Sequence, residues 1–155
     1  MSDLRKQFFN SMCELAENDK SVILLTGDLG FSFYEEYAKR FPKQFINCGI
    51  AEQSMIGIAA GMALGGLKPY VYSGTIFLLM RAYEQVRNDV AYNNLNVKLC
   101  GTGASGFLGF SHNLLGTENE EDLLKNLPNI KRFYPKNERE LKKALISKGC
   151  VYIKL

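Results

Sequence analysis

The feature that most constrains the fold is a regular alternation of short apolar runs with longer segments of helical periodicity. Residues 21–27 read SVILLTG, a continuous apolar run that is rich in branched side chains and ends at Gly27. Such a run is typical of a strand that is covered on both faces. Comparable short runs, each expected to form a strand, lie at residues 44–48, 68–74, 96–101, 130–134 and 151–155.

Helical patterns fill the intervals between these runs. Residues 3–18 carry apolar side chains every three or four positions, and Ser2 is the expected N-cap of this first helix. Further helices are expected at residues 34–40, 51–65, 78–92, 118–125 and 138–147. The alternation predicts an α/β fold: a doubly wound, mostly parallel sheet of about six strands with helices on both faces, in a single domain over residues 1–155.

Composition excludes several functional classes. With 46% apolar and 23% charged residues the chain is expected to fold, and its net charge of +3 is too dispersed for a nucleic-acid binder. The cysteines form no CxxC pair, which favours reduced thiols in a cytoplasmic protein over a zinc or redox site. The longest apolar run, residues 55–67, is shorter than the roughly 20 residues of a membrane span, and no signal peptide is visible.

In a parallel sheet of this kind, ligands bind beyond the carboxyl ends of the strands. Four turns are expected to lie along this edge, at residues 27–30, 49–53, 74–78 and 101–112. Candidate functional residues are therefore expected in these four turns.

Glu52 is the first candidate because it stands in the first turn of an otherwise apolar helix. One interpretation is simple capping, since a helix N-terminus favours a carboxylate. The other is acid–base chemistry. The residues behind Glu52 carry no charge before Lys68, so the carboxyl is expected to be partly desolvated, which makes it a candidate proton donor or acceptor.

Three glycines in the same helix, Gly57, Gly61 and Gly65, are spaced four apart and lie on one face. Each weakens the helix by roughly 0.8 to 1 kcal/mol relative to alanine, so a close contact should compensate. Two interpretations stay open. The glycines either pack against the chain's own sheet, or they form a subunit interface with Glu52 near its seam.

Two further candidates lie in the later turns. Phe77 is one position off the expected apolar stripe of Leu78, Ala82, Val86 and Val90, and it could present its ring to a ligand. His112 is the only histidine, in a glycine-rich loop that matches no phosphate-binding motif. A structural and a functional role are both open for His112.

The sequence also resembles a known family over nearly its whole length. The motifs that carry the resemblance are TGDLG, RFPKQFINCGIAEQSMIGIAAGMALGG, MRAYEQVRNDV, NLNVKL, GFSHN and GTENEEDL. They are similar to the pyrimidine-binding domain of transketolase-type thiamine-diphosphate enzymes, which include 1-deoxyxylulose-5-phosphate synthase and the β subunit of pyruvate dehydrogenase.

The resemblance implies roles for individual residues. Glu52 takes the place of the glutamate that hydrogen-bonds N1′ of the cofactor's aminopyrimidine, and His112 that of the histidine that contacts the donor substrate. Asn113 stands where the family has a second His or Gln, and Leu78 stands where it has the aromatic that stacks on the pyrimidine. Stacking is therefore expected from Phe77, the nearest aromatic, and whether Phe77 or Leu78 packs on the pyrimidine stays open. Two more cofactor-binding candidates are Arg81 and Asp28.

The resemblance also implies a reaction and a partner. The activity would be transfer of a two-carbon ketol unit from a ketose, free or phosphorylated, to an aldehyde. The family's diphosphate-binding motif, GDG followed by an Asn, is not found, so Mg²⁺ ligands are expected on a partner subunit and none on this chain. The expected assembly is an α2β2 hetero-oligomer that binds neither nucleic acid nor membrane.

Two alternatives within the resemblance stay open. The chain could be a non-catalytic regulatory or scaffolding relative, or a subunit of a 2-oxo acid decarboxylase or dehydrogenase. A nucleotide-binding doubly wound domain is disfavoured, because no phosphate-binding glycine turn follows the first strand.

Overall fold

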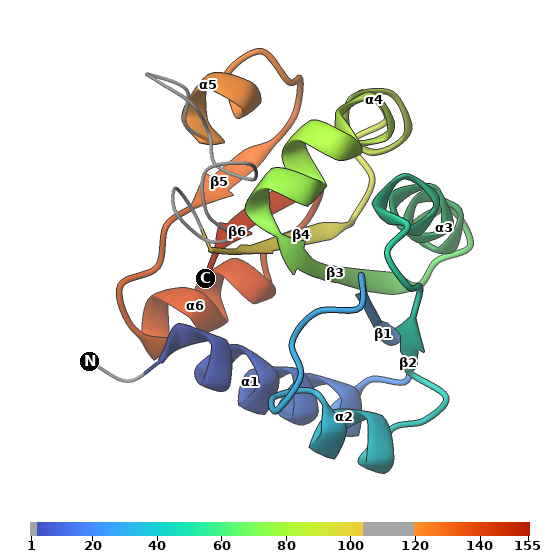
Figure 1. Cartoon of the computed structure of the whole chain (residues 1–155), viewed down its shortest axis with the longest axis vertical. Coiled ribbons are helices and arrows are strands. Elements are labelled where there is room, and N and C mark those ends of the chain that lie inside the picture. Colours follow the sequence, from blue (N-terminus) through green and yellow to red (C-terminus); the bar gives the residue numbers. More distant parts are fainter. Residues whose placement is uncertain (1–2, 104–119) are drawn as a thin grey trace.

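A computed structural model describes residues 3–103 and 120–155 as an α/β sandwich built on one parallel sheet (Figure 1). The six strands pair in the order β2-β1-β3-β4-β6-β5, and every pairing is parallel. Their bounds are β1 Val22–Thr26, β2 Phe45–Asn47, β3 Lys68–Gly74, β4 Lys98–Thr102, β5 Lys131–Phe133 and β6 Val151–Lys154. The predicted fold class is confirmed.

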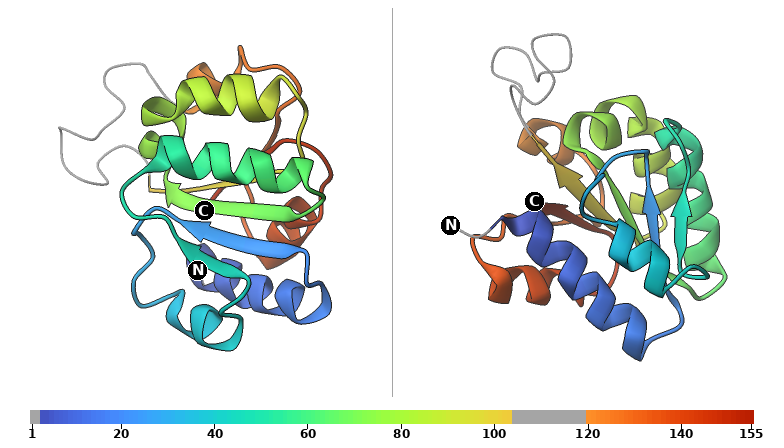
Figure 2. Two further views of the ribbon diagram at one scale, coloured as in Figure 1. Left: turned by 90° about the vertical axis from the view of Figure 1, so that its right-hand side faces the viewer. Right: turned by 60° about the horizontal axis from the view of Figure 1, so that its bottom comes forward.

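Helices cover both faces of this sheet (Figures 1 and 2). One face is covered by α1 Leu4–Asn18, α2 Glu35–Arg40 and α6 Glu138–Leu145. The other is covered by α3 Glu52–Leu64, η1 Phe77–Arg81, α4 Tyr83–Gln85, η2 Val86–Ala91 and α5 Glu120–Leu124.

Alternate residues of the four central strands, β1, β3, β4 and β6, enter two separate hydrophobic cores. In β1, Val22 and Leu24 pack against α1 and α2, whereas Ile23 and Leu25 pack against α3. All of β1 is buried, because successive side chains of a strand point to opposite faces and both faces are covered here. This explains why the strands appear in the sequence as continuous apolar runs.

Two local expectations need correction. The first helix is capped by Asp3, not Ser2: its side chain accepts a hydrogen bond from the Arg5 backbone N–H. The expected helix 78–92 is not regular either. It consists of two π-helical segments, η1 and η2, joined by the single turn α4. Three consecutive residues of η1 are buried, Phe77, Leu78 and Leu79.

The predicted stripe of Leu78, Ala82, Val86 and Val90 is completely buried, which confirms it as core.

The four cysteines are free thiols, and three of them are buried. Within residues 3–103 and 120–155, no helix is long and apolar enough to cross a bilayer, and no cluster of three metal-ligating side chains occurs.

Strand order reverses between β1 and β3, because the chain passes from β1 outward to β2 and then returns across β1 to β3. Ligands of doubly wound sheets bind at such a reversal, beyond the carboxyl ends of the two strands. Those ends are Thr26 and Gly74, and the chain's return path is α3, which begins at Glu52. The topology therefore places the start of α3 at the expected ligand position.

Candidate active site

Glu52 is buried at the carboxyl ends of β1 and β3, with only 1% of its surface exposed. The Ser73 hydroxyl of β3 donates a hydrogen bond to Glu52 Oε1 at 2.9 Å. The Arg81 guanidinium of η1 donates to Oε2 at 2.6 Å. Both carboxylate oxygens are thus held by side chains from neighbouring elements, so their direction is fixed by tertiary contacts and not only by the helix.

Gly27 makes room for this carboxylate. A Cβ at Gly27 would lie 3.0 Å from Glu52 Oε1, 3.0 Å from Ser73 Oγ and 3.3 Å from Met55 Cε. Because real Cβ atoms rarely approach an oxygen this closely, any larger residue would displace Glu52 or Ser73. The glycine that ends β1 is therefore a steric requirement of the site.

Arg81 links Glu52 to the predicted aromatic residue. Its guanidinium carbon lies 4.3 Å from the centre of the Phe77 ring, and 37% of the Arg81 side chain remains exposed. A cation over an aromatic face is favourable, and the contact fixes the position of Arg81. Phe77 keeps 9% of its surface exposed, whereas Leu78 is completely buried in the core under α3.

Asp28, a further cofactor-binding candidate, follows Gly27 and has a positive φ of 56°. It forms two hydrogen bonds with Asn47 at the end of β2: its backbone N–H donates to Asn47 Oδ1, and its Oδ1 accepts from Asn47 Nδ2. Asn47 Oδ1 also accepts from the backbone N–H of Gly49. These bonds tie the turn after β1 to the turn that leads into α3.

The structure thus brings Glu52, Phe77 and Arg81 together and places Asp28 in the adjoining turn. The other two candidates, His112 and Asn113, lie outside the described residues, and their roles stay predictions. Ser73 was missed. Its small hydroxyl looked like part of an apolar strand, and only its position at the carboxyl end of β3 could have indicated a role.

The glycine-bearing face of α3 points outward. A Cβ at Gly57 or Gly61 would meet no heavy atom within 4 Å, so neither glycine packs on the chain's own sheet. The helix also exposes two apolar side chains, with exposed fractions of 43% for Ile58 and 75% for Leu64, and Ile50 just before it is 74% exposed. Since the opposite face is buried, α3 is apolar on both sides, which is typical of a helix that is covered on both.

Comparison with known proteins agrees with this geometry. The family model described as "Transketolase, pyrimidine binding domain" matches residues 1–148. The chain belongs to this family. Its members supply the pyrimidine-binding part of transketolase-type enzymes, as the resemblance implied.

Curated relatives of this pyrimidine-binding domain include subunits of split transketolases. One of the apulose-4-phosphate transketolase subunits of Phocaeicola vulgatus is 37% identical over 145 residues, covering 91% of this chain and 46% of the relative. The 6-deoxy-6-sulfo-D-fructose transketolase subunit SqwH of Clostridium sp. (strain MSTE9) is 31% identical over 157 residues, covering 98% of this chain and 49% of the relative. The chain spans about half the length of these relatives.

A solved structure described as "Split gene transketolase, inactive beta4 tetramer" shares the fold. It is 34% identical, with a TM-score of 0.83 over 97% of this chain and 50% of that one.

Proposed function

We propose that this chain supplies the pyrimidine-binding half of the active site of a split, thiamine-diphosphate-dependent transketolase. The reaction is transfer of a two-carbon ketol unit from a ketose to an aldehyde. The observation that carries the proposal is Glu52: a buried carboxylate at the β1/β3 strand-order reversal, held by Ser73 and Arg81.

The residues present fit the cofactor that the family implies. An aminopyrimidine offers ring nitrogens to a carboxyl group and a flat face to an aromatic ring, and Glu52 and Phe77 supply both at one edge of the sheet. Gly27 keeps the space beside the Glu52 carboxylate clear. When bound, thiamine diphosphate supplies the thiazolium carbon that cleaves the bond next to a ketose carbonyl and holds the two-carbon unit.

Each residue then has a defined role. Glu52 holds or gives a proton at N1′ of the pyrimidine, in a site where burial strengthens that hydrogen bond. Ser73 and Arg81 act as positioning residues, because their hydrogen bonds orient the two Glu52 oxygens. Phe77 packs on the pyrimidine face. His112 and Asn113 are proposed to contact the donor sugar.

The partner is proposed to cover the outward face of α3. That face combines glycines, which allow close approach of another backbone, with the exposed side chains of Ile58 and Leu64, and exposed Ile50 just precedes the helix. The partner would also supply the diphosphate and Mg²⁺ ligands. Two relatives are named for ketoses that carry an anionic group, apulose-4-phosphate and 6-deoxy-6-sulfo-D-fructose. These names support the proposal that the donor ketose of this chain also carries an anionic group.

The test is Glu52→Gln in the complex reconstituted with a partner chain that carries the GDG motif. Two-carbon transfer should fall by about 10² to 10⁴-fold, the usual size of an acid–base contribution, while circular dichroism and thermal unfolding stay close to wild type. Lys39→Ala, at an exposed position of α2 away from α3, is the control and should retain activity. Gly27→Ala should also lower turnover, because its Cβ displaces the carboxylate.

Near wild-type turnover in Glu52→Gln would disprove the proton role. A complex that binds thiamine diphosphate but transfers no ketol unit from any ketose, and instead decarboxylates a 2-oxo acid, would replace the transketolase assignment with the decarboxylase one. No cofactor binding in the complex would favour the scaffolding alternative.

A further inference from the structure

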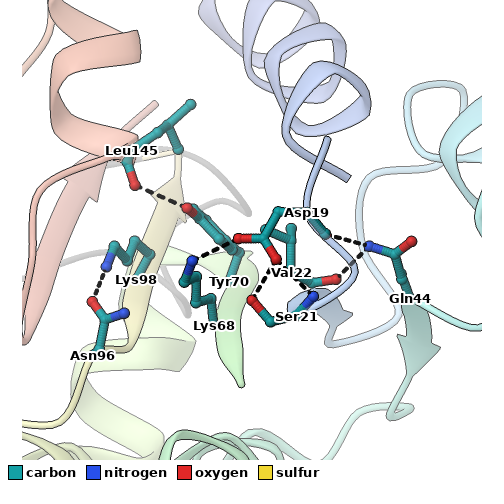
Figure 3. A network of polar contacts seen from close by, with 9 residues as sticks. All are labelled: Asp19, Ser21, Val22, Gln44, Lys68, Tyr70, Asn96, Lys98 and Leu145. Carbon is teal, nitrogen blue, oxygen red and sulfur yellow. Dashed lines mark hydrogen bonds and ion pairs between the residues drawn. The ribbon is translucent and has the colours of Figure 1, made fainter. Parts of the chain in front are cut away.

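A second polar pocket lies at the opposite edge of the sheet, at the amino ends of β1, β3 and β4 (Figure 3). Its volume is about 480 Å³, within the range of small-molecule sites. Polar side chains that line it come from the turns before these strands, from the first residues of β3 and β4, and from the turn between α6 and β6. They are Asp19, Lys68, Tyr70, Asn94, Asn96, Lys98 and Lys148.

Lys98 is the unusual member of this lining, because only 3% of its surface is exposed. An ammonium group has three N–H donors, yet among the described residues Lys98 Nζ has a single hydrogen-bond acceptor, Asn96 Oδ1. No carboxylate of the described chain pairs with it. Its nearest aromatic contact is the Tyr70 ring, whose centre lies 5.9 Å from Nζ. A buried cation in this state is costly unless a further anion compensates it.

The remaining charges of the pocket do not supply that anion. Asp19 is engaged elsewhere: one carboxylate oxygen pairs with Lys68 Nζ at 2.6 Å, and the other accepts hydrogen bonds from Ser21. These bonds lower the pKa of Asp19 to about 2, and the bond to Lys68 contributes most. With three lysines against one aspartate, the lining carries an excess of two positive charges when all are ionised.

Neutral donors complete the arrangement. Asn94 and Asn96 direct their side-chain oxygens to the backbone N–H groups of Cys150 and Gly149. Within the described residues their amide nitrogens donate to no acceptor, so both remain available. Two amides and two to three ammonium groups around a cavity match the acceptor oxygens and double negative charge of a phosphate monoester.

We propose that this pocket binds a small phosphate ester, with Lys98 as the buried contact and Lys148 as the exposed one at its mouth. The site is separate from Glu52, because Lys98 begins β4 and the candidate active site lies beyond the other end of the strands, about 13 Å along the sheet. The inference therefore does not depend on the proposed function.

The test is calorimetric titration of the 155-residue chain with inorganic phosphate and with glycerol phosphate at constant ionic strength. One saturable site is expected. Lys98→Met should weaken it at least tenfold and Lys148→Met about three-fold, roughly the effect of one exposed charge contact. Lys143→Met, an exposed lysine of α6 outside this pocket, is the control and should bind like wild type. Tighter binding of glycerol phosphate than of inorganic phosphate would identify an ester as the ligand.

A structural role of Lys98 makes the opposite prediction for stability. If Lys98 serves only to hold Asn96, Lys98→Met should lower the melting temperature and leave phosphate binding unchanged. The proposal requires that, without phosphate, Lys98→Met be at least as stable as wild type. Added phosphate should then leave the melting temperature of Lys98→Met unchanged. Equal phosphate affinity of Lys98→Met and wild type, or no saturable binding by wild type, would overturn it. Glu52→Gln should bind phosphate normally, which separates this result from any failure of the active-site proposal.

Discussion

Glu52 and Lys98 are the two buried charged side chains of the described residues, and they differ in how their charge is compensated. Glu52 has a cation at 2.6 Å and a hydroxyl at 2.9 Å. Lys98 has one neutral acceptor. A buried charge without a counter-ion destabilises the fold, a cost that applies to Lys98 and not to Glu52, which is paired with Arg81.

Burial lowers the pKa of Lys98 from its ordinary 10.5 to about 8. The charges of Lys131 and Lys68 act in the same direction, whereas Cys100 and Cys150 would raise the pKa of Lys98 only as thiolates. Burial also raises the pKa of both thiols and of Tyr70, that of Cys150 to about 12. In the folded chain these neighbours therefore stay neutral near pH 8.

A pH dependence of stability follows, with a definite sign. Between pH 8 and 10.5 the unfolded chain holds a proton on Lys98 that the folded chain has lost, so stability rises with pH across this window. Relative to Lys98→Met, the wild-type free energy of unfolding should rise by at most about 3 kcal/mol there and stay level below pH 8. Urea unfolding of both proteins measures this difference. The contributions of other titrating groups cancel, because both proteins contain them. A difference that is flat over the whole window would show that the Lys98 pKa is not lowered.

At the scale of elements, α3 shows why an apolar pattern alone left two interpretations open. Its buried face and its outward face are both apolar, so periodicity in the sequence could not say which face meets the sheet. The structure assigns Met55, Ile56, Ala59 and Ala60 to the core and leaves the glycines outside. The segment after β3 was likewise only partly predictable. Its π-helical turns change side-chain spacing in a way that a 3.6-residue period does not predict.

Gly61→Ala should have opposite effects on the chain alone and on its complex. Alone, the variant should be more stable by roughly 0.8 to 1 kcal/mol, because alanine favours the helix and the added Cβ meets no atom. In the complex, the same Cβ should prevent close approach and weaken partner binding several-fold. Thermal unfolding and surface plasmon resonance measure the two effects, with Lys39→Ala on α2 as the association control. Unchanged partner affinity would exclude this face of α3 as the interface.

At the scale of the whole molecule, the proposed function assigns the pyrimidine end of the cofactor to this chain and the diphosphate end to another chain. The two relatives compared above are about twice as long as this chain, and both are named as subunits. Cofactor affinity should therefore depend on assembly, since a ligand held at one end loses most of its contacts.

The chain purified alone should bind thiamine diphosphate weakly and show no ketol transfer. Addition of a GDG-bearing partner should make binding tight and magnesium-dependent, because the partner supplies the metal ligands. Titration of the chain, the partner and their mixture, each with and without Mg²⁺, measures this. Tight magnesium-dependent binding by the isolated chain would refute the split-site proposal.

The sequence by itself determined the parallel α/β fold, the strands and most helices, and Glu52 as the leading candidate. It could do so because covered strands require continuous apolar runs and because the turns at their carboxyl ends must adjoin. Only the tertiary structure decided what surrounds Glu52. Ser73, Arg81 and the clearance at Gly27 come from segments distant in the chain, and they meet only where β1, β3, α3 and η1 converge. The burial of Lys98 could not be predicted for the same reason. A lysine at a strand end is expected to be exposed, and only the surrounding turns of the tertiary structure bury it.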